Sequence, residues 1–129
     1  MPGSSGAHVF VYGSLVDPRQ LTQVLGHPHH GEVLRARLHG YRRVTTPSYA
    51  YPFLVADAQQ CVDGLLVMDL ASTDLVALDA YEEVAEGVYC RVPVEVEAWG
   101  CGPTTATLDA HTYTAGPQLL ERRLPRLEQ

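Results

Sequence analysis

The sequence has 129 residues, of which 46% are hydrophobic and 19% charged, a balance that fits one compact domain and excludes a disordered or fibrous chain. Acidic residues outnumber basic ones by 15 to 9, and the resulting net charge of −6 disfavours nucleic acid as a partner, because phosphate binding requires clustered Lys and Arg. No apolar run reaches the roughly 18 residues of a membrane span, so we expect no membrane partner.

The two ends of the sequence differ in composition from the middle. Residues 1–7 are small and lack the pattern of a secretory signal, which predicts a flexible leader. Residues 8–116 are expected to form a single domain, and residues 117–129 a polar C-terminal tail. Three cysteines without disulfide or zinc spacing favour a reducing, cytoplasmic location. Cys61 and Cys90 stand in apolar strand contexts and are expected to be buried and inert.

The first predicted element is a short strand, Val9 to Tyr12, whose unbroken apolar character is typical of a strand buried on both faces. Gly13 ends it. Asp17 is a helix N-cap with Pro18 at the first helical position, and Gly26 ends that helix. A glycine between strand and helix lets consecutive amide groups converge on an anion, with the Ser14 hydroxyl as a further donor. An ordinary turn is the alternative interpretation.

The next segment alternates between turn signals and strand patterns. His27, His29 and His30 are close enough to suggest a metal site, but no Cys or carboxylate stands at ligand spacing, so a surface loop is favoured. Residues 32–44 predict a strand or hairpin arm. Four arginines are expected on the solvent face of this arm: Arg35, Arg37, Arg42 and Arg43. Residues 47–53, rich in Pro and Tyr, predict an irregular aromatic loop and a candidate pocket wall.

An apolar strand, residues 62–70, precedes a second predicted helix over residues 75–83. At about 100° of rotation per residue, Glu82 falls between Leu75 and Leu78 on the apolar side of this helix. Burial raises the pKa of a carboxyl group, so Glu82 is a candidate general base. The alternative is that Glu82 only bonds a backbone amide or an arginine such as Arg91. Asp79 lies at an intermediate angle.

The last third of the sequence predicts a β-hairpin. Residues 92–98 alternate between apolar and polar, residues 100–103 predict the turn, and residues 105–113 form the partner strand, with a break at Gly116. Five or more strands with two short helices predict an α+β fold. Because closure removes exposed strand edges, we expect a small mixed β-barrel, closed or strongly curled, with flanking short helices.

Several short motifs, taken together and in this order, resemble the γ-glutamylcyclotransferase-like family over residues 8–113. They are V-F-V-Y-G-S-L near the start, Y-P at 51–52, D-G-L-L-V-M-D-L at 63–70, L-D-A-Y-E at 78–82 and Y-C-R-V-P-V at 89–94. The sequence is most similar to the small bacterial and AIG2-like branch, which includes γ-glutamylamine cyclotransferases. The resemblance implies a small barrel with flanking helices and neither metal nor cofactor.

The resemblance also implies a reaction and the residues that carry it. A γ-glutamyl amide or amine is converted to 5-oxoproline and a free amine by intramolecular attack, with Glu82 as the proton acceptor. The substrate α-carboxylate is held by Tyr12, Gly13, Ser14 and Leu15, and Tyr113 resembles a pocket tyrosine of the family. The sequence departs from the family where Glu83 replaces a frequent glycine, and Glu86 adds negative charge expected near the pocket rim.

The expected partner is thus a small γ-glutamyl substrate, bound by a monomer or a weak homodimer. Two other functions stay open on the sequence. One is a non-catalytic module that binds a small carboxylate, and the other is a hydrolase or acyl-removing enzyme on the same scaffold, in which water attacks instead of the substrate amine.

Overall fold

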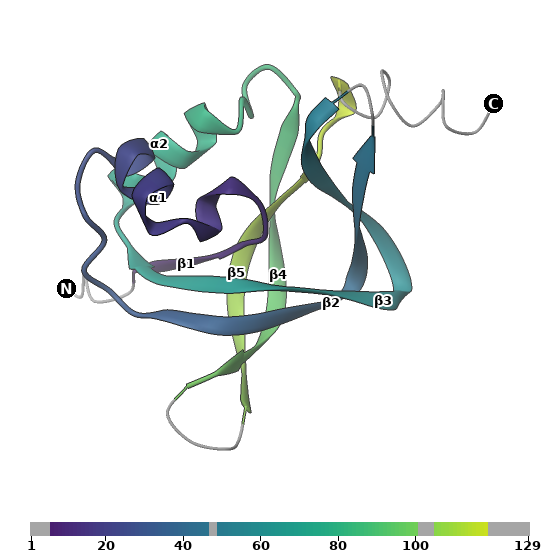
Figure 1. Cartoon of the computed structure of the whole chain (residues 1–129), viewed down its shortest axis with the longest axis horizontal. Coiled ribbons are helices and arrows are strands. Elements are labelled where there is room, and N and C mark those ends of the chain that lie inside the picture. The colour runs from purple at the N-terminus through teal and green to yellow at the C-terminus, as the bar shows by residue number, and fades with distance from the viewer. Residues whose placement is uncertain (1–5, 47–48, 101–104, 119–129) are drawn as a thin grey trace.

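The computed structural model describes residues 6–46, 49–100 and 105–118. Within these residues, five strands, two longer α-helices and one 3₁₀ turn follow one another (Figure 1). They are β1 (Ala7–Val11), η2 (Ser14–Val16), α1 (Pro18–Leu25), β2 (Val33–Thr46), β3 (Tyr49–Leu70), α2 (Ser72–Tyr81), β4 (Tyr89–Trp99) and β5 (Thr105–Ala115).

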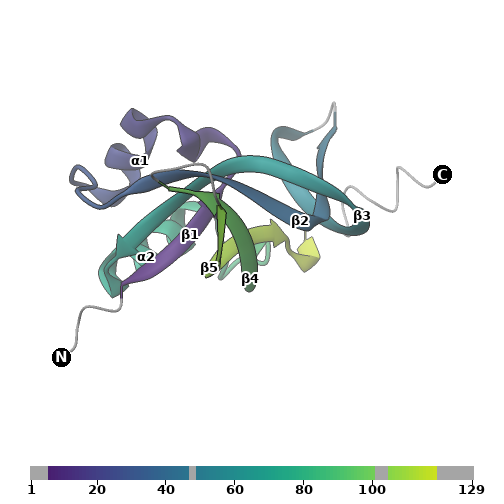
Figure 2. The same ribbon diagram turned by 90° about the horizontal axis from the view of Figure 1, so that it is seen from below.

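The strands form a closed barrel in the order β1-β3-β2-β4-β5. Neighbouring strands are antiparallel, except where β5 returns to β1 and pairs with it in parallel, Val9 opposite His111. Figure 2 shows β2 and β3 running together as a long curved ribbon that reaches beyond the other strands. The predicted α+β fold with a small mixed barrel is therefore confirmed.

Strand β1 separates two apolar cores, which explains its uninterrupted apolar sequence. Phe10 packs into the barrel interior, a cluster to which all five strands contribute. Val9 and Val11 point to the other side, where they pack with residues of both helices, including Leu21 and Leu78. Val9, Phe10 and Val11 are each at most 4% exposed, as predicted for a strand covered on both faces.

Gly64 in β3 allows β1 to lie close against it. A Cβ at this position would clash with the carbonyl oxygen of Val11, so any larger residue would push the two strands apart. Val11 is the last residue of β1. The glycine therefore helps to fix the point at which the chain leaves the barrel and enters the following loop.

Helix α1 has the predicted capping residues. The Asp17 side chain accepts a hydrogen bond from the Arg19 amide at 2.9 Å, Pro18 is the first helical residue, and Gly26 ends the helix with φ of 82°. Helix α2 begins earlier and ends earlier than predicted. It ends at Tyr81, so that Glu82 is its C-cap residue. Both helices lie on the same side of β1 (Figure 1).

The predicted irregular loop at residues 47–53 is wrong for the residues that the structure describes. Strand β3 already begins at Tyr49, and Phe53 pairs with Val44 and is fully buried. Pro52 lacks an amide hydrogen and is tolerated because it lies in an irregular stretch of the β2–β3 ladder, between Val44 and Thr46 on the partner strand. The prolines and tyrosines of this segment interrupt the alternation of apolar and polar residues that indicates a strand in a sequence.

Three smaller predictions need correction or lie outside the described residues. Ala7, placed in the flexible leader, pairs with Leu70 in β1. Cys61 is exposed rather than buried, and Cys90 is only partly buried. Residues 1–5, most of the predicted turn at 100–103 and most of the tail at 117–129 fall outside the described ranges.

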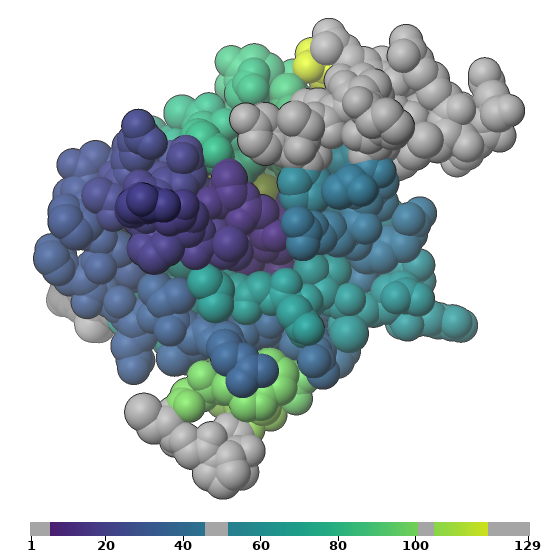
Figure 3. All heavy atoms as spheres, in the orientation of Figure 1, coloured from purple at the N-terminus to yellow at the C-terminus, as the bar shows by residue number. Residues whose placement is uncertain are grey.

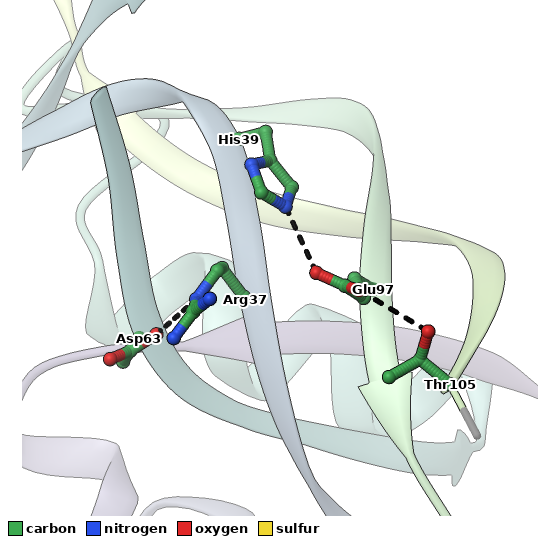
Figure 4. Close-up of polar contacts among 5 residues, drawn as sticks. All are labelled: Arg37, His39, Asp63, Glu97 and Thr105. Carbon is green, nitrogen blue, oxygen red and sulfur yellow. Dashed lines mark hydrogen bonds and ion pairs between the residues drawn. The ribbon is translucent and has the colours of Figure 1, made fainter. Parts of the chain in front are cut away.

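Charged residues on the outer face of the barrel are paired across neighbouring strands (Figure 4). The Arg37 Nε group donates to Asp63 at 2.7 Å, and the hydrogen bond lowers the pKa of Asp63. Glu97 lies 3.0 Å from His39 and accepts from Thr105, and the His39 contact lowers its pKa. The predicted solvent face of the arginine-rich strand is confirmed. No described helix is long and apolar enough to span a membrane.

Candidate active site

A cavity of about 230 Å³ opens where the loop after β1 meets the end of α2. In the space-filling view, the N-terminal segment (purple) and the green segment containing the end of α2 lie side by side on the surface (Figure 3). Twelve residues line the cavity: Phe10, Val11, Tyr12, Gly13, Ser14, Leu15, Pro52, Tyr81, Glu82, Glu83, Tyr89 and Tyr113.

The loop after β1 forms one wall of this cavity through a 3₁₀ turn. The Val16 amide donates to the Gly13 carbonyl at 3.1 Å, so the amides of Ser14 and Leu15 precede the first hydrogen bond of the turn and have no partner within it. Leu15 is 5% exposed and anchors the loop in the helix-side core. A Cβ at Gly13 would lie 3.4 Å from the Pro52 ring, so glycine keeps this part of the cavity open.

Ser14 connects the loop to the second helix. Its hydroxyl lies 2.8 Å from the Tyr81 hydroxyl, across 67 residues of sequence. Gln20 of α1 donates to the same tyrosine oxygen at 3.4 Å. The polar side of the loop is therefore held against the residue that directly precedes Glu82.

Glu82 is the more buried of the two acids that line the cavity. Its backbone amide donates to the Leu78 carbonyl at 2.9 Å, which fixes the residue at the end of α2. Its carboxylate makes no hydrogen bond or ion pair with the residues that the structure describes. Burial raises its pKa from 4.5 to about 7. The group is therefore able to accept and return a proton near neutral pH.

Asp79, the other acid considered as a base, has two partners. The Tyr113 hydroxyl donates to one Asp79 oxygen at 2.7 Å, and the Arg91 Nε atom forms an ion pair with the same oxygen at 3.0 Å. Burial and the bond to Asp79 raise the pKa of Tyr113, which therefore stays protonated. Arg91 thus pairs with Asp79 and leaves Glu82 without a cation, contrary to the alternative considered for Glu82 from the sequence.

The segment that follows β1 contacts β5 next to the Asp79–Tyr113 pair. The Tyr12 hydroxyl donates to the Tyr113 backbone carbonyl at 2.6 Å, although the two residues are 101 positions apart. Tyr89 donates to the Pro52 carbonyl at 2.9 Å and closes another side of the cavity. The tyrosine side chains are therefore positioned by the barrel.

All six residues singled out in the sequence line this cavity: Tyr12, Gly13, Ser14, Leu15, Glu82 and Tyr113. The predicted pocket wall is confirmed at Pro52, which lines the cavity. Phe10, Tyr81 and Tyr89 also line it without a predicted role, although each lies within one of the motifs. Glu83 was noted in the sequence as a departure from the family directly after the candidate base. It lines the cavity, whereas Glu86, expected near the rim, is exposed and is not a lining residue.

No group of three or more His, Cys, Asp or Glu side chains suited to a metal ion occurs among the described residues. His27, part of the histidine-rich loop, instead lies 2.8 Å from an oxygen of Asp74, which also caps α2 by accepting from the Ala71 amide. This contact joins the loop after α1 to the start of α2.

Comparison with known proteins connects this geometry to one family. The family model "Gamma-glutamyl cyclotransferase, AIG2-like" matches residues 9–128. AIG2-like protein A from Arabidopsis thaliana is 34% identical over 86 residues, which is 63% of this chain and 51% of that protein. The chain thus spans about half the length of the curated relative it matches.

Solved structures share the fold. A protein from Arabidopsis thaliana, determined in solution, has a TM-score of 0.71 at 27% identity, covering 99% of this chain and 87% of its own. A γ-glutamyl cyclotransferase has a TM-score of 0.66 at 16% identity, covering 84% of this chain and 66% of its own, a likeness of fold alone. With most of its length matched by the family model, the chain belongs to the AIG2-like γ-glutamyl cyclotransferase family.

Proposed function

We propose that this protein is a cytoplasmic cyclotransferase that converts a small γ-glutamyl amide or amine to 5-oxoproline and a free amine. The observation that carries the proposal is the partly buried, unpaired carboxylate of Glu82, whose pKa burial raises to about 7, in a small cavity beside the strand–glycine–serine loop. A group of this kind is suited to general base catalysis. We expect a monomer or a weak homodimer.

The glutamyl head group is held by the loop after β1. The amides that precede the first bond of the 3₁₀ turn and the Ser14 hydroxyl are donors for its α-carboxylate. The substrate α-ammonium then lies toward Glu82, whose negative charge attracts it. A cavity of about 230 Å³ suits a glutamyl unit with a short amine, because pockets for larger ligands measure roughly 300 to 1,000 Å³.

The reaction requires one carboxyl group. Glu82 removes a proton from the α-ammonium, and the freed amine nitrogen attacks the γ-carbonyl carbon to close a five-membered ring. The bond to the leaving nitrogen then breaks, and that nitrogen takes the proton from Glu82. The ring nitrogen loses its second proton to the released amine or to water, which leaves the neutral amide N–H of 5-oxoproline. Well-oriented intramolecular attack corresponds to effective molarities of about 10⁵ to 10⁸ M. No covalent enzyme intermediate is formed.

The residues on the barrel side of the cavity are positioned to stabilise the γ-carbonyl oxygen during ring closure. As the γ-carbonyl oxygen gains negative charge it needs a hydrogen-bond donor, and loop amides or a tyrosine are the candidates, each worth on the order of 3 kcal/mol. Asp79, bonded to Tyr113 and paired with Arg91, holds the tyrosine in place. In this arrangement Asp79 is a positioning residue and Glu82 is the base.

The test is a screen of γ-glutamyl amino acids and γ-glutamyl amines in which both possible products are measured. We expect 5-oxoproline together with an equal amount of free amine. Free glutamate in place of 5-oxoproline would identify a hydrolase. Saturable binding of γ-glutamyl compounds without any product would identify a non-catalytic carboxylate-binding module. Either result would overturn the proposal.

A further inference from the structure

Glu83 is placed in a backbone conformation that a glutamate seldom adopts. Its φ is 55°, in the left-handed region that glycine occupies without steric cost. Its carbonyl accepts hydrogen bonds from the amides of Glu86 and Val88 at 3.2 Å each, so the turn after α2 depends on this conformation. A glycine would adopt this conformation at a lower steric cost than a glutamate. A strained residue beside a cavity points to a role for its side chain.

The cavity is negatively charged at the side that faces solvent. Its two charged lining residues are both acids, Glu82 and Glu83. Ser14 and Glu83 are its two exposed lining residues, so they mark its solvent side. Glu83 makes no ion pair with any residue that the structure describes, and the nearby cation Arg91 is paired with Asp79.

The leaving group of the substrate must pass this solvent side. Under the proposed function, the glutamyl head group occupies the Ser14 loop and its ammonium contacts Glu82. The amine attached to the γ-carbonyl then extends outward, where Glu83 is the remaining charged group. We propose that Glu83 is a specificity-determining residue that selects γ-glutamyl derivatives whose leaving amine carries a second positive charge, such as an aliphatic diamine. This inference rests on the proposed function and names its substrate class.

The negative charge of Glu83 determines both the sign and the size of the expected preference. A cation at the far end of the leaving group is attracted to Glu83, whereas a carboxylate there is repelled. Because Glu83 is exposed, water and salt screen the interaction, and an exposed pair changes binding by about twofold to fivefold. The difference between a cationic and an anionic leaving group is then about tenfold. Since the charge lies away from the reacting atoms, the effect is expected in KM more than in kcat.

Three γ-glutamyl amides of matched length test the proposal. Their leaving amines are 1,4-diaminobutane, n-pentylamine and 4-aminobutyrate, which end in a cation, a methyl group and a carboxylate. We expect kcat/KM for 5-oxoproline release to fall in that order, with about a tenfold range at low ionic strength and a smaller one at high salt. Equal kcat/KM values for the three in the wild-type protein would overturn the inference.

Variants then assign the preference to a residue. Glu83→Gln should bring the cation-to-anion ratio to within about twofold, and Glu83→Lys should invert it. Glu83→Gly, which the positive φ favours, gives the same readout in a chain that relieves the strain. Glu86→Gln removes an equal charge from an exposed residue outside the cavity and should leave the ratio unchanged.

The outcomes separate the two levels of the proposal. An unchanged ratio in Glu83→Gln and Glu83→Gly, with 5-oxoproline still released, overturns the role of Glu83 and leaves the proposed function standing. Failure of the wild-type protein to release 5-oxoproline from any of the three amides, or from the wider screen, overturns the proposed function and this inference together.

Discussion

Carboxyl groups on the outer face of the barrel and in the cavity beside α2 have pKa values shifted in opposite directions. On the outer face, Asp63 is exposed and Glu97 partly exposed, each has a basic partner, and these contacts lower both pKa values. In the cavity, Glu82 is partly buried without a partner, and its pKa rises to about 7. An acid stabilised as its anion is a poor proton acceptor, so the proposed proton transfer is expected in the second region.

The largest expected effect is on turnover in Glu82→Gln. The amide has nearly the same shape but cannot accept the proton, so kcat/KM for 5-oxoproline release should fall by about a thousandfold. Circular dichroism should show an unchanged fold. Asp63→Asn is the matched control, because it makes the same chemical change on the outer face. Near-normal turnover in Glu82→Gln would move the base elsewhere, with Asp79 the next candidate.

The pH dependence of kcat/KM in the wild-type protein tests whether the base is a buried carboxyl group with a raised pKa. Glu82 acts only when deprotonated, so kcat/KM should rise about tenfold per pH unit below the pKa of about 7 and level off above it. Between about pH 5 and about pH 8 the change is then on the order of a hundredfold. If kcat/KM is already independent of pH above about pH 5, the catalytic carboxyl group has the pKa of a solvent-exposed acid, which would contradict its burial in the cavity.

Tyr113→Phe tests the tyrosine that Asp79 holds in the cavity. The substitution removes the hydrogen bond to Asp79 and should lower the free energy of unfolding by about 1 kcal/mol and kcat/KM by about tenfold. Denaturant unfolding and steady-state kinetics measure the two effects. Tyr41→Phe, a change with no hydrogen bond to lose among the described residues, is the control and should alter neither.

Stability should respond to Glu82 in the opposite direction from activity. Because its folded pKa is raised, the wild-type protein loses stability as pH rises from about 4.5 to about 7 and the buried carboxyl group ionises. Glu82→Gln does not ionise. It should therefore be more stable than wild type by roughly 3 kcal/mol above pH 7, with the gain disappearing below pH 4.5. A gain that is independent of pH would contradict burial as the cause.

The smallest effect is expected on the outer face. Asp63→Asn breaks an exposed pair with Arg37 that water and salt already screen, so the unfolding midpoint and kcat/KM should stay within experimental scatter of wild type. Thermal unfolding at low and high salt measures this directly. A clear loss of activity would show that the two regions are not independent.

The sequence predicts local features of this fold well and long-range pairings poorly. The Asp17, Pro18 and Gly26 signals gave α1 correctly because capping depends on neighbouring residues. The strand through Pro52 was missed, since a proline is compatible with a strand only at an irregularity in the ladder, which the sequence does not reveal. Helical spacing identified Glu82 as a buried acid, although Glu82 caps the helix instead of continuing it.

Other features of the site depend on contacts that no local pattern contains. The pairing of Arg91 with Asp79 instead of Glu82 is set by the approach of β4 to α2. The presence of Glu83 in the cavity follows from its positive φ, which redirects the chain just after the helix ends.

The parallel pairing of β1 with β5 makes the cavity dependent on the order in which the protein is synthesised. During synthesis Tyr12 leaves the ribosome before Tyr113, whose carbonyl it binds and which follows 101 residues later. Until β5 closes the barrel, the loop that carries Gly13 and Ser14 has no finished pocket beside it. Activity should therefore appear only after the last strand has docked, which makes it a late reporter of folding in this chain.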